Sequence, residues 1–183
     1  MAKRAILPAL MISALLAGCG GADAETRIEE RRDALADAEE ITFTALVTAD
    51  LGDEVFKCTL LCGATPEALT VEVAAPEAVA GVRARMSAGE TTLEYEGVIL
   101  SVGGLEDGPL AAMPLLLAAL KSGHVIRAWA EEEGGCFAAQ LYADDEEELT
   151  VWFDAETLSP VAASLSREGA ERIRCEIQEF QFR

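Results

Sequence analysis

Few side chains in this 183-residue sequence could act as nucleophiles, proton carriers or metal ligands. His124 is the only histidine, which excludes chemistry that needs several imidazoles, such as a three-histidine zinc site. No serine lies in a Gly-x-Ser-x-Gly turn, and the sequence has no glycine-rich phosphate-binding loop. We therefore expect no enzyme, no cofactor and no metal site. His124 is expected to be a partly exposed residue at the start of a strand.

Two acidic runs, 131–133 and 144–148, raise the question of calcium binding. Both lack the alternating ligands and the turn glycine of a calcium-binding loop. If the runs join successive strands of an antiparallel meander, they lie at opposite ends of the sheet and cannot share an ion. We expect both to be hairpin tips exposed to solvent.

Beyond residue 50 the sequence contains four cysteines: Cys58, Cys62, Cys136 and Cys175. Cys58 and Cys62 fall on one expected strand, where they would be about 13 Å apart. That separation is too large for a disulfide between them without a bulge. Four cysteines allow three pairings. The sequence leaves open whether these residues are buried free thiols or form disulfides.

Residues 1–18 have the organisation of a signal peptide, with Lys3 and Arg4 ahead of the apolar segment 5–17. This segment is too short to be a comfortable transmembrane helix. It is followed directly by a cysteine, Cys19. An ordinary signal peptide with a chance cysteine is the alternative to a lipid-modified one.

The tetrapeptide that ends in Cys19, Leu-Ala-Gly-Cys, resembles the bacterial lipobox at all four positions. The resemblance implies cleavage before Cys19 and attachment of diacylglycerol to its sulfur. Two or three chains, palmitate among them, would hold the protein firmly on a membrane, whereas one would not. Residues 19–23 would then be a lipidated tether. The expected location is the cell membrane or an outer membrane, facing outside the cytoplasm.

The remaining chain, 24–183, has the composition of one globular domain. The apolar content of the full sequence, 51%, is enough for a sizeable core. The formal net charge of −19 excludes nucleic acid as a partner, because phosphates require a basic surface. It also argues against docking on anionic lipid by charge alone. We expect a monomer.

Periodicity predicts an α+β fold. The stretch 24–40 is charged, rich in alanine and free of glycine and proline, and is expected to be a helix. Alternation of apolar and polar residues, with turn residues between segments, predicts about eleven antiparallel strands in one strongly curved sheet. The expected strands are 41–48, 56–62, 69–75, 82–87, 91–95, 98–102, 124–130, 136–142, 149–154, 160–167 and 171–182.

The last expected strand contains a change of phase. Phe180 and Phe182 are out of phase with the apolar residues that precede them in 171–182. One inserted residue would restore the register, so we expect a β-bulge near Gln178 or Glu179.

The long apolar run 109–123, PLAAMPLLLAALKSG, follows the sixth expected strand. Pro109 suits the start of a helix and Gly123 its end. Pro114 lacks an N–H and predicts a break, with a turn at 109–113 and a short helix at about 114–121. A helix apolar nearly all round must be buried. It could be a core helix or a lid, lying as a plug in the concavity of the sheet, and the residues alone favour the core helix.

The order of lipobox, helix, six strands, apolar helix and five strands is similar to that of the lipoprotein-carrier superfamily. This superfamily includes the periplasmic carrier and outer-membrane acceptor of lipoprotein localisation, mycobacterial lipid-binding lipoproteins and a clostridial germination lipoprotein. The stretch 149–160, LTVWFDAETLSP, resembles the family's hairpin, in which an aromatic strand enters a turn and a proline opens the next strand. The resemblance covers about residues 25–183. Two features depart from it: the carrier's acyl-binding arginine has no assignable match, and the four cysteines are not a general family feature.

The resemblance implies a half-barrel whose concave apolar face is closed by helices and can hold acyl chains, which favours the lid. The expected function is then a membrane-anchored lipoprotein that binds a lipid or the acyl chain of another lipoprotein. The alternative is a lipidated envelope protein with a filled core, which binds a protein partner through its acidic surface. The residues expected to line the concave site are Leu110, Met113, Leu116, Leu117, Leu120, Phe43, Phe56 and Leu60.

Overall fold

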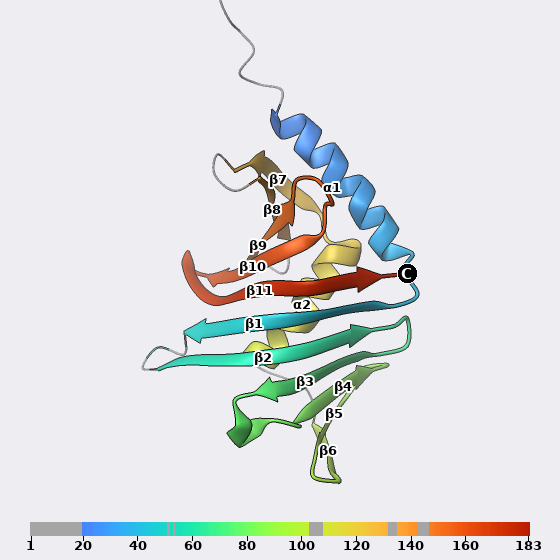
Figure 1. Ribbon diagram of the computed structural model, residues 1–183, viewed down its shortest axis with the longest axis vertical. Helices are drawn as coiled ribbons and strands as arrows, with labels where there is room; N and C mark the ends of the chain where they lie inside the picture. The colour runs from blue at the N-terminus through green and yellow to red at the C-terminus, as the bar shows by residue number, and fades with distance from the viewer. Residues whose placement is uncertain (1–19, 51, 53, 103–107, 132–134, 143–146) are drawn as a thin grey trace, which may run out of the picture.

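The structure is a computed structural model, and Figure 1 draws the residues that it does not describe as a grey trace. The residues it describes are 20–50, 52, 54–102, 108–131, 135–142 and 147–183.

Over these residues, the fold is one eleven-stranded antiparallel sheet with two α-helices (Figure 1). The strands follow the order β6-β5-β4-β3-β2-β1-β11-β10-β9-β8-β7, so the first and last strands pair at the centre and the sheet stays open at β6 and β7. The helices are α1 (Gly20–Ala36), α2 (Pro109–Ser122) and the short 3-10 helix η1 (Glu77–Val79). The strands are β1 (Ile41–Asp50), β2 (Val55–Ala64), β3 (Leu69–Ala75), β4 (Arg83–Ser87), β5 (Glu90–Tyr95), β6 (Val98–Val102), β7 (Val125–Ala130), β8 (Cys136–Tyr142), β9 (Glu147–Asp154), β10 (Pro160–Arg167) and β11 (Ala170–Phe182). The expected α+β half-barrel is therefore confirmed.

The N-terminal helix is displaced toward the N-terminus from the expected 24–40. It begins at Gly20, inside the stretch expected to be a tether, and ends at Ala36. The early end has a tertiary cause, because the backbone beyond the helix pairs with the end of the chain. The Glu39 N–H donates to the Arg183 carbonyl at 2.7 Å, and the Arg183 N–H donates to the Glu40 carbonyl at 3.0 Å.

The expected break at Pro114 is wrong, because α2 runs without interruption from Pro109 to Ser122. Pro114 is the sixth residue of the helix, so it removes one early intrahelical hydrogen bond and costs about 3 kcal/mol. Met113, Leu116 and Leu120 are almost fully buried, and each contributes about 1.5–3 kcal/mol by leaving water. Tertiary burial therefore outweighs the local penalty.

The expected bulge in the last strand is present. β11 pairs with β1 through Thr42 opposite Gln181 and Thr44 opposite Gln178, so an extra residue lies between these pairs. Glu179 adopts a φ of 54°, the left-handed conformation that a bulge residue can require. The insertion lets Phe180 pack against the core together with the apolar residues that precede it.

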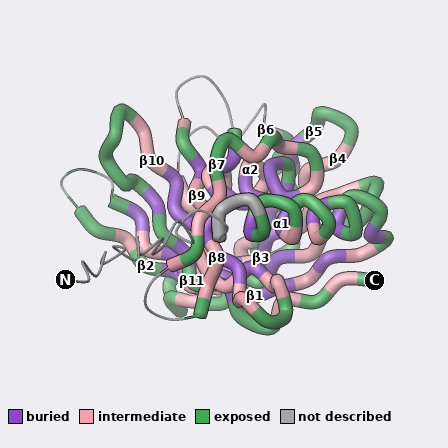
Figure 2. The backbone as a smooth tube through the Cα atoms, turned by 90° about the horizontal axis from the view of Figure 1, so that it is seen from above, coloured by how far each residue is buried: buried purple, intermediate pink, exposed green. Residues whose placement is uncertain are grey.

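The core fills the space between the concave face of the sheet and the two helices. Figure 2 shows the buried stretches of the strands and of α2 gathered in the interior, with exposed stretches on the turns and on the outside of α1. In β1 the buried and half-buried positions alternate strictly from Ile41 to Ala49, as the period of a strand requires. Ile28 and Leu35 bring α1 into the same apolar cluster as α2. One continuous core therefore joins both helices to the sheet.

Candidate functional site

The concave face is occupied by α2, which buries six of its fourteen residues in the interior. Its buried residues are Ala112, Met113, Leu116, Leu117, Ala119 and Leu120. The helix contacts α1, β1 and β3, so it lies across the concavity rather than along its rim. In Figure 1 it passes behind β11, β1 and β2.

Six of the eight residues expected to line the concave site belong to the buried core, and the other two, Leu110 and Phe56, are partly buried and pack against it. Leu60 and Leu120 are 0% exposed, and Leu116 is 1% exposed. A side chain lining an open cavity of several hundred Å³ would keep exposed surface toward it. The structure therefore brings these residues together in a closed arrangement, packed against one another.

One polar side chain enters this apolar environment from α1. Arg32 is 8% exposed and lies one turn from Ile28, on the buried face of the helix. Its Nε has no hydrogen-bond partner. Desolvation by burial lowers the pKa of Arg32, and the negative charges of Glu29 and Asp33 oppose that shift. A buried donor without an acceptor is a cost in the empty protein and a contact point for an oxygen-bearing ligand.

Two other arginines of α1 hold the helix against the turn between β9 and β10. Arg27 donates to the Ala155 carbonyl at 2.8 Å, and Arg31 donates to the Leu158 carbonyl at 3.1 Å. The same guanidinium groups lie over aromatic rings: Arg27 over Phe137, and Arg31 over Phe182. These contacts attach α1 to the sheet independently of α2.

Three thiols lie on the concave side of the central strands. Cys58 and Cys175 are both opposite Val47 of β1, one from β2 and one from β11, and Cys62 lies four residues further along β2. Burial raises the pKa of Cys62 to about 12 and that of Cys175 to about 11. These side chains are therefore protonated at neutral pH and weakly nucleophilic. Among the described residues no disulfide is present, and Cys136 is half-buried at the start of β8.

His124 is exposed and immediately precedes β7, close to its expected place. Its backbone carbonyl accepts a hydrogen bond from the Tyr142 N–H at 3.0 Å. The described residues contain no group of three or more His, Cys, Asp or Glu side chains that could hold a metal ion.

The acidic runs are only partly hairpin tips. Glu131 is half-buried, and one carboxylate oxygen accepts hydrogen bonds from the indole N–H groups of Trp129 at 2.9 Å and Trp152 at 3.1 Å. Glu147 and Glu148 belong to β9 rather than to a turn. The expectation of solvated tips is wrong for Glu131, which accepts from the two indoles, and for Glu147, which pairs with Arg167. Glu148 is exposed, as expected, but lies in a strand rather than in a turn. The rest of both runs lies outside the described residues.

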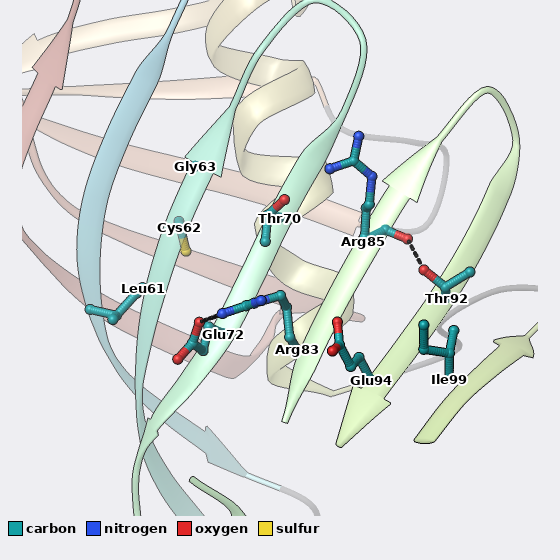
Figure 3. Close-up of a pocket in the computed structure, with 10 residues that line it drawn as sticks. All are labelled: Leu61, Cys62, Gly63, Thr70, Glu72, Arg83, Arg85, Thr92, Glu94 and Ile99. Atoms are coloured by element: carbon teal, nitrogen blue, oxygen red, sulfur yellow. Dashed lines mark hydrogen bonds and ion pairs between the residues drawn. The ribbon is translucent and has the colours of Figure 1, made fainter. Parts of the chain in front are cut away.

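A second candidate site lies on the outer face of the sheet, opposite α2. It is a groove of about 510 Å³ over β2 to β6 (Figure 3). Two rows of side chains cross it, because the register aligns one residue from each strand. The first row is Gly63, Thr70, Arg85 and Thr92, and the register continues to Ser101 on β6, outside the lining of the groove. The second row is Leu61, Glu72, Arg83, Glu94 and Ile99.

The sequence analysis missed this groove because the outward residues of each strand, taken alone, are those of an ordinary solvent-exposed strand. The alternation does indicate which residues point outward. It does not align β2 with β6, which depends on the turns and on the register shift between β2 and β3. The charges thus come together only in the folded sheet.

The lipidation site predicted at Cys19 lies outside the described residues. Across the part of the chain that the structure describes, neither α-helix has the length and apolar character needed to span a membrane.

No protein-family model matches the chain, and no curated protein matches its sequence. Solved structures do resemble it. An uncharacterized conserved protein from Thermus thermophilus has a TM-score of 0.51 at 13% identity, over 86% of each chain. A LolA superfamily protein from Nitrosomonas europaea has a TM-score of 0.46 at 8% identity, over 87% of this chain and 94% of that one. LprF from Mycobacterium bovis has a TM-score of 0.45 at 10% identity, over 88% and 94%.

The resemblance stated from the sequence is to the lipoprotein-carrier superfamily, and a LolA superfamily protein is among the solved structures to which this chain is similar. At identities of 8–13% the likeness concerns the architecture of the sheet and helices. It does not extend to individual site residues.

Proposed function

We propose that this protein is a lipid-anchored envelope lipoprotein that binds an acyl chain on the concave face of its half-barrel. The single observation that carries the proposal is α2, an almost wholly apolar helix laid into the concavity. An element of this kind can open to admit another apolar body of similar size and then pack over it. The structure is then the closed, ligand-free form.

The energies of opening and of binding are comparable. Four large side chains of α2 are buried, which corresponds to about 6–12 kcal/mol at 1.5–3 kcal/mol each. An acyl chain of about fifteen methylene groups would contribute about 12 kcal/mol at 0.8 kcal/mol each. A bound chain can therefore offset the burial that α2 loses. A short chain cannot, so the site discriminates by chain length.

Arg32 supplies the polar end of the proposed site. Its unpaired Nε lies on the face of α1 that packs into the core. A carboxylate or ester oxygen at the head of the acyl chain would accept a hydrogen bond from it. A charge-assisted hydrogen bond of this kind is stronger than a neutral one.

Native mass spectrometry of protein isolated from its membrane tests the binding step. We expect an adduct with the mass of a long-chain lipid, lost on competition with free palmitate. Repeated absence of any adduct, with palmitate present in excess, would contradict acyl binding.

The anchoring step has its own test. Cells fed a labelled fatty acid should label the wild-type protein but not Cys19→Ala, which should also keep its leader. A wild-type protein that takes up no label would contradict the anchor without bearing on the concave site.

A second candidate function is favoured by the closed packing around Leu60, Leu116 and Leu120. If α2 is permanent core, the concave face binds nothing and the protein acts through its outer surface as a lipidated interaction protein. The net charge of −19 then disfavours acidic partners. Exchange of the α2 amides with solvent separates the two functions.

A further inference from the structure

We propose that the outer groove over β2 to β6 binds an extended peptide segment of a partner protein, one that carries an acidic residue and a basic residue two positions apart. The groove lies on the face of the sheet opposite α2, so this interaction does not depend on lipid binding. The proposal rests on the two cross-strand rows lying side by side. The first row, called the cationic row below, contains Arg85 as its only charged residue, and the second, the anionic row, contains two glutamates and one arginine.

The anionic row is organised around Arg83. Its Nε donates to Glu72 at 3.1 Å, and a second donor of the same guanidinium bonds the same carboxylate oxygen. The hydrogen bond and charge of Glu72 raise the pKa of Arg83, and Glu94 adds to that shift from the next strand. One cation thus lies between two carboxylates. The row retains one net negative charge, which can attract a basic side chain.

The cationic row is organised around Arg85, two residues along the same strand. Within the described part of the chain, the Arg85 guanidinium makes no hydrogen bond and no ion pair, while the hydroxyl of Thr92 donates to the Arg85 backbone carbonyl at 3.4 Å. Its neighbours across the strands are Thr70 and Thr92, and neither carries charge. Figure 3 shows Arg83 directed toward Glu72, whereas Arg85 projects away from that pair. Arg85 is therefore available to an external carboxylate.

The distance between the rows selects an extended chain. Residues two apart in a strand are separated by about 6.7 Å, and this is also the spacing of same-face side chains in any extended peptide. A peptide running along β4 would place one side chain over Arg85 and the next on that face beside Glu94, the carboxylate of the second row to which Arg83 does not donate. Either direction of the peptide satisfies the pattern, because the charges, and not the backbone polarity, set the match.

Apolar shoulders border the groove at the two ends of the anionic row. Leu61 is 46% exposed and Ile99 is 65% exposed. They lie about 19 Å apart, since four strand spacings separate β2 from β6. Gly63 presents bare backbone in the cationic row, and a Cβ there would meet nothing within 4 Å. Exposed apolar side chains beside an unpaired arginine suit a protein partner, and the two carboxylates repel nucleic acid.

The test is a titration of full-length protein, in detergent micelles, with a fluorescent hexapeptide blocked at both ends. The probe carries one Glu and one Lys two positions apart. A matched peptide carries them at adjacent positions, so that they point to opposite faces. We expect saturable binding of the first peptide and binding about tenfold weaker for the second.

Charge reversal in the protein completes the test. Arg85→Glu should lower the affinity for the Glu-x-Lys peptide about tenfold, and this variant should bind a Lys-x-Lys peptide more tightly than the wild type does. Arg172→Glu, an exposed arginine of β11 with the same change of charge, should leave the Glu-x-Lys affinity unchanged. Equal binding of both spacings, equal binding by Arg85→Glu and wild type, or no saturable binding by the folded wild type would each overturn the proposal.

Discussion

The rings of Phe43 and Phe180 lie 5.9 Å apart between centroids and are inclined by 31°. They come from β1 and β11, the first and last strands in the sequence, which pair at the centre of the sheet. The contact exists because the bulge at Glu179 turns Phe180 toward the core. The seam between the two halves of the half-barrel therefore depends on one residue of unusual backbone conformation.

Glu179→Gly should leave stability unchanged or raise it, because glycine adopts a φ of 54° without strain. Glu179→Val should lower the free energy of unfolding by about 1–2 kcal/mol, since a β-branched residue is disfavoured in that conformation. Glu176→Val, an exposed position in the regular part of β11, is the control and should be tolerated. Urea denaturation measures all three. Equal losses for both valine variants would show that the bulge conformation is not the cause.

Gly123→Ala should loosen the end of α2. A Cβ at this position would lie 2.8 Å from the Ala119 carbonyl oxygen and 3.1 Å from that of Tyr142, both on backbone that cannot yield easily. We expect a loss of about 1–3 kcal/mol. Gly63→Ala, where the added methyl meets open space, is the matched control. Thermal unfolding that is the same for both variants would contradict the close approach of α2 to β8.

Arg32→Met should separate stability from binding. The variant removes a buried donor that has no acceptor and keeps an apolar side chain of similar length, so the empty protein should gain about 1 kcal/mol. Affinity for palmitate should fall several-fold, because the head of the chain loses its charged partner. Arg172→Met on the outer surface is the control for the lost charge. Unchanged palmitate affinity in Arg32→Met would remove Arg32 from the proposed site.

The buried thiols predict a loss of stability at alkaline pH. The pKa of Cys62, about 12, and of Cys175, about 11, are raised above the ordinary value of 9.0, so the unfolded chain releases these protons first. Their contribution is fully present below pH 9 and falls as the pH rises toward 11 or 12, by at most about 1.4 kcal/mol per pH unit for each thiol. Cys62→Ala should have a flatter stability profile between pH 9 and 11 than the wild type. An identical slope in both proteins would contradict the burial of this thiol.

The alternation of side chains was sufficient to predict the sheet. β3 and β6 begin and end where the periodicity places them, and the phase change before Phe180 located the bulge. These features depend on neighbours in sequence, or on one face of one strand. The sheet order then follows from hairpins and from the pairing of β1 with β11.

Features that depend on distant contacts could not be predicted in this way. Pro114 breaks an isolated helix, but the burial of α2 keeps it continuous. Glu131 has the sequence context of a hairpin tip, yet two indoles from separate strands donate to it. Arg32 resembles the other charges of α1, and only the packed helix shows that it faces the core. Each depends on a partner that the local sequence does not identify.

The central claim is that α2 opens to admit an acyl chain and then packs over the bound chain, and hydrogen exchange with and without palmitate tests it most directly. An element that opens belongs to the less stable part of a structure. We predict faster amide exchange across 115–121 than across 41–47 and 171–177 in the empty protein, and slower exchange across 115–121 once palmitate is bound. Exchange across 115–121 as slow as in those central strands, and unchanged by palmitate, would contradict the account and leave α2 as permanent core.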